Sequence, residues 1–337
     1  MVLRTKHHNQ STRQQIPIEH NGIYPYLVRY LDWLLVKGYS VETKKSRDNA
    51  LRTFIEWCDQ RDIQQPQDVT KPILERYQRH LFYYRKDNGK PIAFSTQKSL
   101  LQSVKGFFKW LTQQNYLLYN PASEIQMPKA PKRLPKTILS VEQIKSIIHQ
   151  PDTSTPQGIR DRAILELLYS TGIRRMELCN LKIHELNLER KTVLILGKGS
   201  KERMLPIGQS AITWLVKYLD DVRPQLCLAL EETSFFLTDY GEAYTGSVLG
   251  WLVKNTMKNA GIHIEGSCHL FRHAMATHML ENGSDIRFIQ AMLGHSELST
   301  TEIYTKVSVE KLREIHSVTH PAEKSDRNIN NDKSLGA

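Results

Sequence analysis

The 337-residue sequence contains four cysteines and no CxxC pair. Because these cysteines lie far apart, the sequence indicates neither a disulfide framework nor a structural zinc site, and we expect reduced thiols. Long apolar runs are also missing, since no stretch approaches a membrane span and residues 1–15 include no hydrophobic export segment. These absences predict a protein that stays in the cytoplasm and has no membrane partner.

Positive charge, in contrast, is in excess, with 46 Lys and Arg residues against 35 Asp and Glu, a net charge of +11. Residues 1–135 carry 22 basic and 11 acidic side chains, and residues 136–337 carry 24 of each. This asymmetry favours a polyanionic partner, and nucleic acid is the commonest polyanion in the cytoplasm. Charge alone leaves open that the N-terminal part is merely a basic soluble domain.

Residues 20–126 are predicted to form an all-helical domain. Apolar residues recur at helical spacing in four segments, which run from Tyr24 to Lys37, from the N-cap Ser40 to Cys58, from Lys71 to Tyr84, and from about Ser95 to Leu111. Basic side chains on these helices could neutralise phosphates without reading sequence, although a solvated face is the ordinary interpretation of each one. The candidate DNA contacts are Lys44, Lys45, Arg47, Lys98, Lys105 and Lys109 of the helices, and Lys132 and Arg133 beyond them.

Three prolines and four cations in the segment MPKAPKRLPK mark residues 127–139 as an extended linker that could follow a nucleic-acid backbone. The capping box Ser140-Val-Glu-Gln143 then opens a second domain, predicted over residues 140–319. Residues 1–19 and 320–337 are polar and lack periodicity. They are predicted to be a flexible arm and a disordered tail.

The first motif of the second domain is a buried-looking helix that breaks at Gly172, followed by a helix carrying Arg174 in its first turn. A guanidinium there adds to the positive end of the helix dipole, which favours an anion such as phosphate in front of it. Glu177, three residues on, could orient Arg174 from behind. An ordinary surface ion pair is the alternative for these two residues.

Residues 193–207 are predicted to form a β-hairpin with Lys198 near its tip. The competing interpretation is a nucleotide-binding loop, but Thr192 stands where that loop requires glycine and Gly199 where it requires serine or threonine. Helices are predicted over residues 211–230 and 246–260, with Trp251 packed inside. An amphipathic segment over residues 306–317 could dock on a neighbouring subunit or, equally, on its own domain.

Residues 265–304 gather the side chains best suited to phosphodiester chemistry. His269 and Arg272 are three apart on one face of a predicted helix. A second helix, over residues 285–293, is ended by glycine, so that His295 lies just past a helix terminus. Tyr304 follows a polar step and could move into or out of a site, although half-buried packing is the ordinary interpretation of a single tyrosine.

His269 and His273 also form an i, i+4 pair, which suggests zinc. The metalloprotease pattern, however, requires glutamate after the first histidine, where this chain has Leu270. The sequence therefore predicts no metal site.

The segments LLYSTGIRRMEL, GKGSKER, HLFRH and LGHSELSTTEIYTK resemble, in order and spacing, the motifs of the tyrosine recombinases, also called the phage integrase family. The likeness is greatest to Xer-type or mobile-element recombinases. It implies a mainly α fold, with an N-terminal all-helical SAM-like DNA-binding domain and an α+β catalytic domain that is mostly helical around a small β-hairpin sheet. Arg175 stands where the family usually has a smaller or apolar residue, which leaves the subgroup open.

The resemblance also implies a reaction, in which DNA is cut and rejoined through a 3′-phosphotyrosine intermediate without ATP, metal or another cofactor. Tyr304 would be the nucleophile, and Arg174 and Arg272 would stabilise the charge that develops on the phosphate. Lys198 would protonate the leaving 5′-oxygen, His269 would assist proton removal from the tyrosine, and His295 would hydrogen-bond the phosphate.

Strand exchange implies double-stranded DNA with specific recombination sites and a tetramer, either of this chain or shared with a related recombinase. Two alternatives from other classes are DNA relaxation of the type IB topoisomerase kind and a DNA-binding regulator that does not cleave. The target sequence and the biological task, which could be chromosome-dimer resolution, integration or transposition, stay open.

Overall fold

The computed structural model describes residues 17–128, 138–197, 202–228, 231–294 and 309–321. These residues form two units, one on each side of residues 129–137, and each unit has its own hydrophobic core. The predicted combination of a helical first domain with a mostly helical second domain around a small sheet is confirmed.

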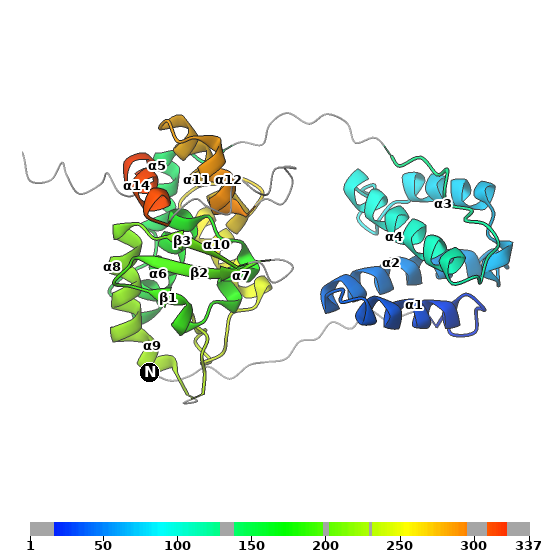
Figure 1. Cartoon of the computed structure of the whole chain (residues 1–337), viewed down its shortest axis with the longest axis horizontal. Helices are drawn as coiled ribbons and strands as arrows, with labels where there is room; N and C mark the ends of the chain where they lie inside the picture. Colours follow the sequence, from blue (N-terminus) through cyan, green and yellow to red (C-terminus); the bar gives the residue numbers. More distant parts are fainter. Residues whose placement is uncertain (1–16, 129–137, 198–201, 229–230, 295–308, 322–337) are drawn as a thin grey trace, which may run out of the picture. The chain divides into compact units, whose positions relative to one another are not determined.

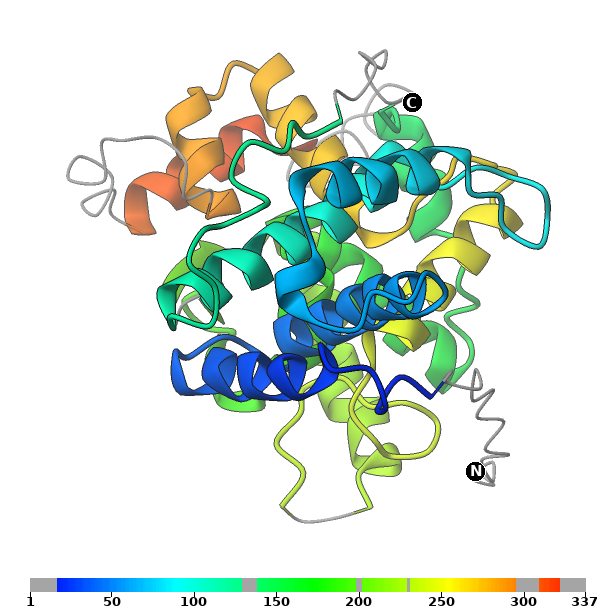
Figure 2. The same ribbon diagram turned by 90° about the vertical axis from the view of Figure 1, so that its right-hand side faces the viewer.

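In its described part, the first unit is built from the α-helices α1 (Tyr24–Val36), α2 (Val41–Asp59), α3 (Lys71–Tyr83) and α4 (Phe94–Gln113). Helices α1, α2 and α4 pack on one another, and α3 packs on α4 (Figures 1 and 2). Ser40 caps α2 as predicted, since its side-chain oxygen accepts the backbone N–H of Thr43. The core is rich in aromatic rings, and Phe54 lies edge-on to both Tyr77 and Phe108.

The second unit has a longer succession of elements. They are α5 (Val141–Ile148), α6 (Pro156–Thr171), α7 (Arg175–Asn180), β1 (Leu186–Asn187), β2 (Thr192–Leu196), β3 (Glu202–Pro206), α8 (Gln209–Lys217), α9 (Arg223–Leu226), α10 (Gly246–Asn259), α11 (Cys268–Glu281), α12 (Ile286–Leu293) and α14 (Val309–Thr319). The sheet is antiparallel in the order β1-β2-β3, with Val193 opposite Leu205 in the predicted hairpin. Figure 1 shows α8 on one side of the sheet and α11, α12 and α14 beyond β3.

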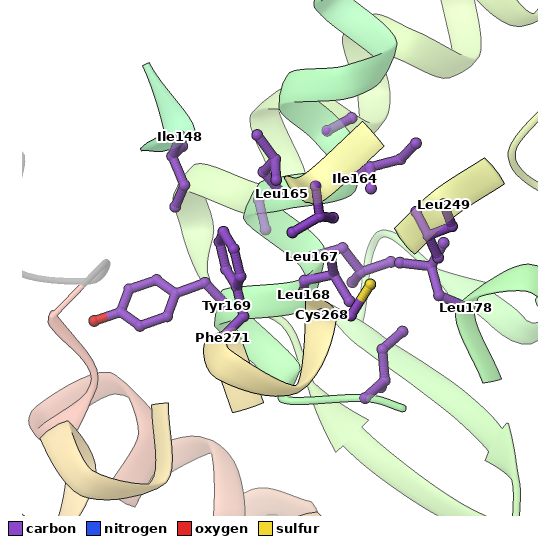
Figure 3. Packing of buried hydrophobic residues seen from close by; sticks show 14 of the residues in the cluster. Ile148, Ile164, Leu165, Leu167, Leu168, Tyr169, Leu178, Leu249, Cys268 and Phe271 are labelled. Atoms are coloured by element: carbon purple, nitrogen blue, oxygen red, sulfur yellow. The ribbon is translucent and has the colours of Figure 1, made fainter. Parts of the chain in front are cut away.

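Helix α6 is the centre of this unit, because 13 of its 16 residues are buried. A helix that is buried on every side belongs in the core of a domain. It packs against α5, α8, α11 and β3. Figure 3 shows the side chains of Leu167 and Leu168 meeting Cys268 and Phe271 of α11 and Leu178 of α7. Helices α7 and α11 are therefore attached to one shared core.

Two features of the predicted helices differ from the structure. The helix expected over residues 211–230 widens into a π-helical turn at Tyr218–Val222 and ends at Leu226. Pro224 explains the change, because it lacks the N–H that would continue the α-helical ladder. Trp251 was expected to pack inside but is 68% exposed.

A few described residues at the edges of the two units lie in the ranges predicted as arm, linker and tail. Ile18, Leu139 and His320 are buried, although they fall in the ranges predicted as arm, linker and tail. Single residues beside a polar stretch give no periodic signal in the sequence. The remainder of those three ranges lies almost wholly outside the described residues.

Helix α14 packs against β3 and α11 of its own unit, which is one of the two dockings that the sequence left open. Its end is held by two imidazoles, since His316 and His320 hydrogen-bond through Nε2 to the carbonyls of Ser170 and Tyr169, at 2.8 and 2.9 Å. Their rings stack with centroids 4.6 Å apart.

The cysteines are free thiols, and Cys58, Cys179 and Cys268 are buried. Among the helices that the structure describes, none combines the length and the apolar character needed to cross a membrane.

Candidate active site

Gly172 turns the chain from α6 toward the candidate site. It has a left-handed backbone with φ of 61°, and a Cβ placed there would lie 2.1 Å from Cε of Met275. The chain therefore passes directly against α11. Arg174 follows as the N-cap of α7. The sequence predicted it within the first turn of this helix, one position further on.

Glu177 holds Arg174 from the interior side. One carboxylate oxygen accepts the backbone N–H of Arg174, and the other accepts its Nη1, both at 2.8 Å. The Glu177 side chain is 7% exposed, whereas that of Arg174 is 42% exposed. The carboxylate is thus the inner partner and the guanidinium the outer one, as the predicted orienting role of Glu177 requires.

Arg203 on β3 is a third member of this cluster, which the sequence reasoning missed. Its Nη1 and Nη2 donate to the two carboxylate oxygens of Glu177 at 3.0 and 2.7 Å. Its side chain is 13% exposed. The sequence did contain a signal for Arg203, because this residue pairs with Ile195 across the hairpin. Side chains alternate along a strand, so the charge lies on the same face of the sheet as an apolar residue.

These hydrogen bonds determine the charge of Glu177. Burial alone would raise the pKa of this carboxyl, but the hydrogen bonds from Arg203 and Arg174 outweigh burial and lower the pKa to about 2. Glu177 is therefore ionised at neutral pH. One negative charge lies between two guanidinium groups, which leaves the cluster positive.

Arg272 approaches the cluster from α11. Its Nη1 donates to the carbonyl of Gly172 at 2.7 Å, and its Nη2 donates to the carbonyl of Leu293 at 2.5 Å. Burial, followed by the repulsion of Arg174 and Arg203, lowers the pKa of Arg272 to about 10. The group stays protonated at neutral pH, so a third positive charge is held close to the other two.

The end of α12 is where the three arginines meet. Arg203 Nε donates to the carbonyl of Met292 at 3.0 Å, Arg272 Nη2 to that of Leu293, and Arg174 Nη2 to that of Gly294 at 3.1 Å. The last carbonyls of a helix lack partners within the helix and carry the negative end of its dipole, so cations are favourable there. Three consecutive carbonyls thus gather guanidinium groups from β3, α11 and the start of α7.

His269 lies in the first turn of α11, one turn before Arg272, and its side chain is exposed. The structure therefore brings together Arg174, Glu177 and Arg272, with His269 beside them on α11. Lys198, His295 and Tyr304 lie outside the described residues. Two of them adjoin described chain ends, since Lys198 follows Gly197 after β2 and His295 follows Gly294.

Among the residues that the structure describes, the histidine pair of α11 that suggested zinc does not form part of a larger group of ligands. His269 and His273 have ring centroids 6.4 Å apart. Within the described ranges, no three His, Cys, Asp or Glu side chains gather into a group able to hold a metal ion.

The candidate DNA contacts of the first unit differ in their surroundings. Lys105 donates to the carbonyls of Ser123 and Ile125, and Arg47 donates to Ser103, so both have roles within the fold. Lys44 and Lys45 pair with acidic side chains of α1 and α2. Lys98 and Lys109 are exposed on α4 and make no hydrogen bond or ion pair within the described part of the chain. Lys132 and Arg133 are outside that part.

Comparisons with known proteins agree with this arrangement. The chain matches the phage integrase family over residues 137–311 and the N-terminal SAM-like domain of phage integrases over residues 27–117. It is 51% identical over 307 residues to tyrosine recombinase XerC 2 of Ralstonia nicotianae, covering 91% of this chain and 88% of the relative. It is 35% identical over 299 residues to tyrosine recombinase XerD of Pseudomonas putida, covering 88% and 98%.

A crystal structure of XerH site-specific recombinase bound to difH substrate has the same fold, with a TM-score of 0.64 and 22% identity over 91% of this chain and 90% of that one. The sequence matches do not favour the two alternatives, a topoisomerase and a regulator that does not cleave. The chain belongs to the phage integrase family and is an Xer-type tyrosine recombinase, an enzyme that breaks and rejoins DNA at specific sites.

Proposed function

We propose that Arg174 and Arg272 bind the scissile phosphate of the recombination site and that Tyr304 attacks it. The observation that carries this proposal is the convergence of guanidinium groups from separate segments on the end of α12. Arginine forks match the oxygens of a phosphate and strengthen as charge develops on them. Removal of one such donor costs roughly 3 kcal/mol of transition-state stabilisation in other enzymes.

The proposed reaction conserves the energy of the phosphodiester. The phenolate oxygen of Tyr304 forms a bond to phosphorus while the bond from phosphorus to the 5′-oxygen breaks. This leaves a 3′-phosphotyrosine and a free 5′-hydroxyl. His269 accepts the tyrosine proton, Lys198 gives a proton to the leaving oxygen, and His295 hydrogen-bonds the phosphate. Because attack by a 5′-hydroxyl reverses the step, rejoining needs no ATP or cofactor.

The experiment that tests this proposal uses a duplex recombination site with a nick beside the cleavage position, so that the released 5′-terminated fragment diffuses away. The protein is incubated with end-labelled DNA in EDTA, and denaturing electrophoresis separates free DNA from protein-linked DNA. We expect a covalent adduct that a protease converts to a short peptide on the 3′-phosphate side. An adduct on the 5′ side would contradict the proposed polarity.

We further propose that the enzyme acts on DNA in the cytoplasm as a tetramer on two recombination sites, because exchange between two duplexes requires four strand cleavages. The tetramer consists of this chain alone or includes a related recombinase. Recombination between two plasmid-borne sites by the purified protein alone would show that the tetramer can consist of this chain alone. Relaxation of a plasmid that lacks any site would favour the topoisomerase alternative instead.

In the first unit, we expect Lys98→Gln and Lys109→Gln to weaken DNA binding at every sequence alike. Both lysines lie on one face of α4, eleven residues apart, and are exposed. Each lost phosphate contact should reduce the slope of log K against log salt by about 0.9. Lys105→Gln is the contrasting variant, since this lysine holds two backbone carbonyls of the fold. It should lower the melting temperature, and binding titrations over a range of salt concentrations check the slopes.

A further inference from the structure

Arg203 has the most constrained side chain of the arginine cluster. It is the second residue of β3, and its guanidinium donates hydrogen bonds to both oxygens of Glu177 and to the carbonyl of Met292. Its neighbours Glu202 and Met204 are exposed, while Arg203 is 13% exposed. The strand itself does not require a buried cation at position 203. Removing a guanidinium from water is costly unless its hydrogen bonds are made.

The carboxylate of Glu177 is shared evenly between two arginines. Oε1 accepts Nη1 of Arg174 and Nη1 of Arg203, and Oε2 accepts the backbone N–H of Arg174 and Nη2 of Arg203. Arg203 thereby fixes the orientation of the carboxylate on its buried side. The same carboxylate fixes Arg174 on its exposed side. A change at Arg203 is consequently transmitted to Arg174 through a single intermediate group.

Arg203 also packs against the end of α12. A Cβ on Gly294 would lie 3.2 Å from Cδ of Arg203 and 3.3 Å from its Nε, so the guanidinium packs closely against the last described residue before His295. On its own strand, Arg203 comes two residues after the 198–201 segment that carries Lys198.

We propose that Arg203 is a positioning residue for the cleavage reaction. It acts on Arg174 through Glu177, and its bond to the carbonyl of Met292 holds it against the end of α12. This proposal rests on the proposed function, because it takes Arg174 to be the group that binds the scissile phosphate. Arg203 itself need not touch DNA, and its bidentate contact explains why arginine is required in place of lysine.

The main test compares Arg203→Met with the wild type in single-turnover cleavage of the nicked site at saturating protein. We expect cleavage to slow roughly 100-fold, the order of effect that a misplacement of about 1 Å produces in an active site. The affinity for DNA should change less than threefold. Arg203→Lys should regain part of the rate, because an ammonium can reach one carboxylate oxygen. Arg190→Met, in the exposed turn between β1 and β2, is the matched control and should cleave normally.

The pH profile distinguishes positioning from a general loss of structure. The pKa of Glu177 in the wild type is about 2, and the hydrogen bonds from Arg203 are the largest cause that lowers it. Without them, less opposes the effect of burial, so the pKa of the carboxyl rises from about 2, and the protonated form pairs less well with Arg174. The acid limb of the cleavage rate of Arg203→Met should therefore lie at a higher pH than that of the wild type.

A double-mutant cycle with Glu177→Gln completes the test. If Arg203 acts through Glu177, the double variant should cleave no more than about threefold slower than Glu177→Gln alone. Fully additive losses, or an Arg203→Met enzyme with wild-type rate and pH profile, would overturn the inference. If the wild type itself forms no adduct, the proposed function fails instead. Should Arg203→Met prove unfolded by circular dichroism, Arg203→Lys must show the same shift of the acid limb for the inference to stand.

Discussion

Tyr304→Phe should form no covalent protein–DNA adduct, with a reduction of at least about 1000-fold relative to the wild type. Removal of a nucleophile that acts in concert with its partners eliminates the catalysed step and leaves the binding groups in place. Affinity for the recombination site should stay within about twofold, because the arginines and the basic surface of the first unit are unchanged. Denaturing electrophoresis of the nicked-site reaction gives the adduct, and gel-shift titration gives the affinity.

The matched control for this change is Tyr119→Phe, which removes a phenolic oxygen from a side chain that is 63% exposed in the first unit. It should form the adduct at the wild-type rate. A normal amount of adduct from Tyr304→Phe would show that a different side chain attacks the phosphate. The assignment of Tyr304, and with it the role of His269 as proton acceptor, would then be wrong.

Arg272→Lys should slow cleavage by a factor of roughly 100 to 1000 while DNA binding falls much less. The two Nη atoms of Arg272 reach carbonyls on different segments, Gly172 and Leu293, in a geometry that a fork can span. A lysine ammonium is a compact charge on a flexible stem and cannot hold both carbonyls while it also faces a phosphate. Single-turnover rates at saturating protein measure the loss without interference from binding.

Arg287→Lys provides the control for Arg272→Lys, since Arg287 is exposed and pairs with Asp285 at the opposite end of α12. Its cleavage rate should match that of the wild type. If Arg272→Lys cleaves as fast as this control, a single positive charge suffices at the position. The argument from the guanidinium fork would then be incorrect.

Local signals in the sequence were enough to predict most of the secondary structure. Ser40 and Ser140 cap helices as expected, and Gly294 ends α12 in a left-handed conformation. Each of these features depends on a few neighbouring residues, so a short stretch of sequence contains the necessary information. The hairpin was equally visible, because two apolar runs flank a Gly/Lys turn.

Features that depend on distant contacts were less accessible. Arg203 was missed because its partners Glu177 and Met292 lie 26 and 89 residues away. Lys105 looked like a phosphate ligand, yet it supports the segment that ends the first unit. Trp251 looked like a core residue from its hydrophobicity alone and is exposed. In each case the tertiary fold, not the local pattern, decides what the side chain does.

The docking of α14 limits how far Tyr304 can travel. The tyrosine is five residues from Val309, where α14 begins, and even a fully extended chain of that length reaches only roughly 17 Å. On the other side, the ten residues from Gly294 permit about twice that distance. While α14 keeps its place against β3 and α11, the shorter of these two connections starts from a point fixed on its own unit.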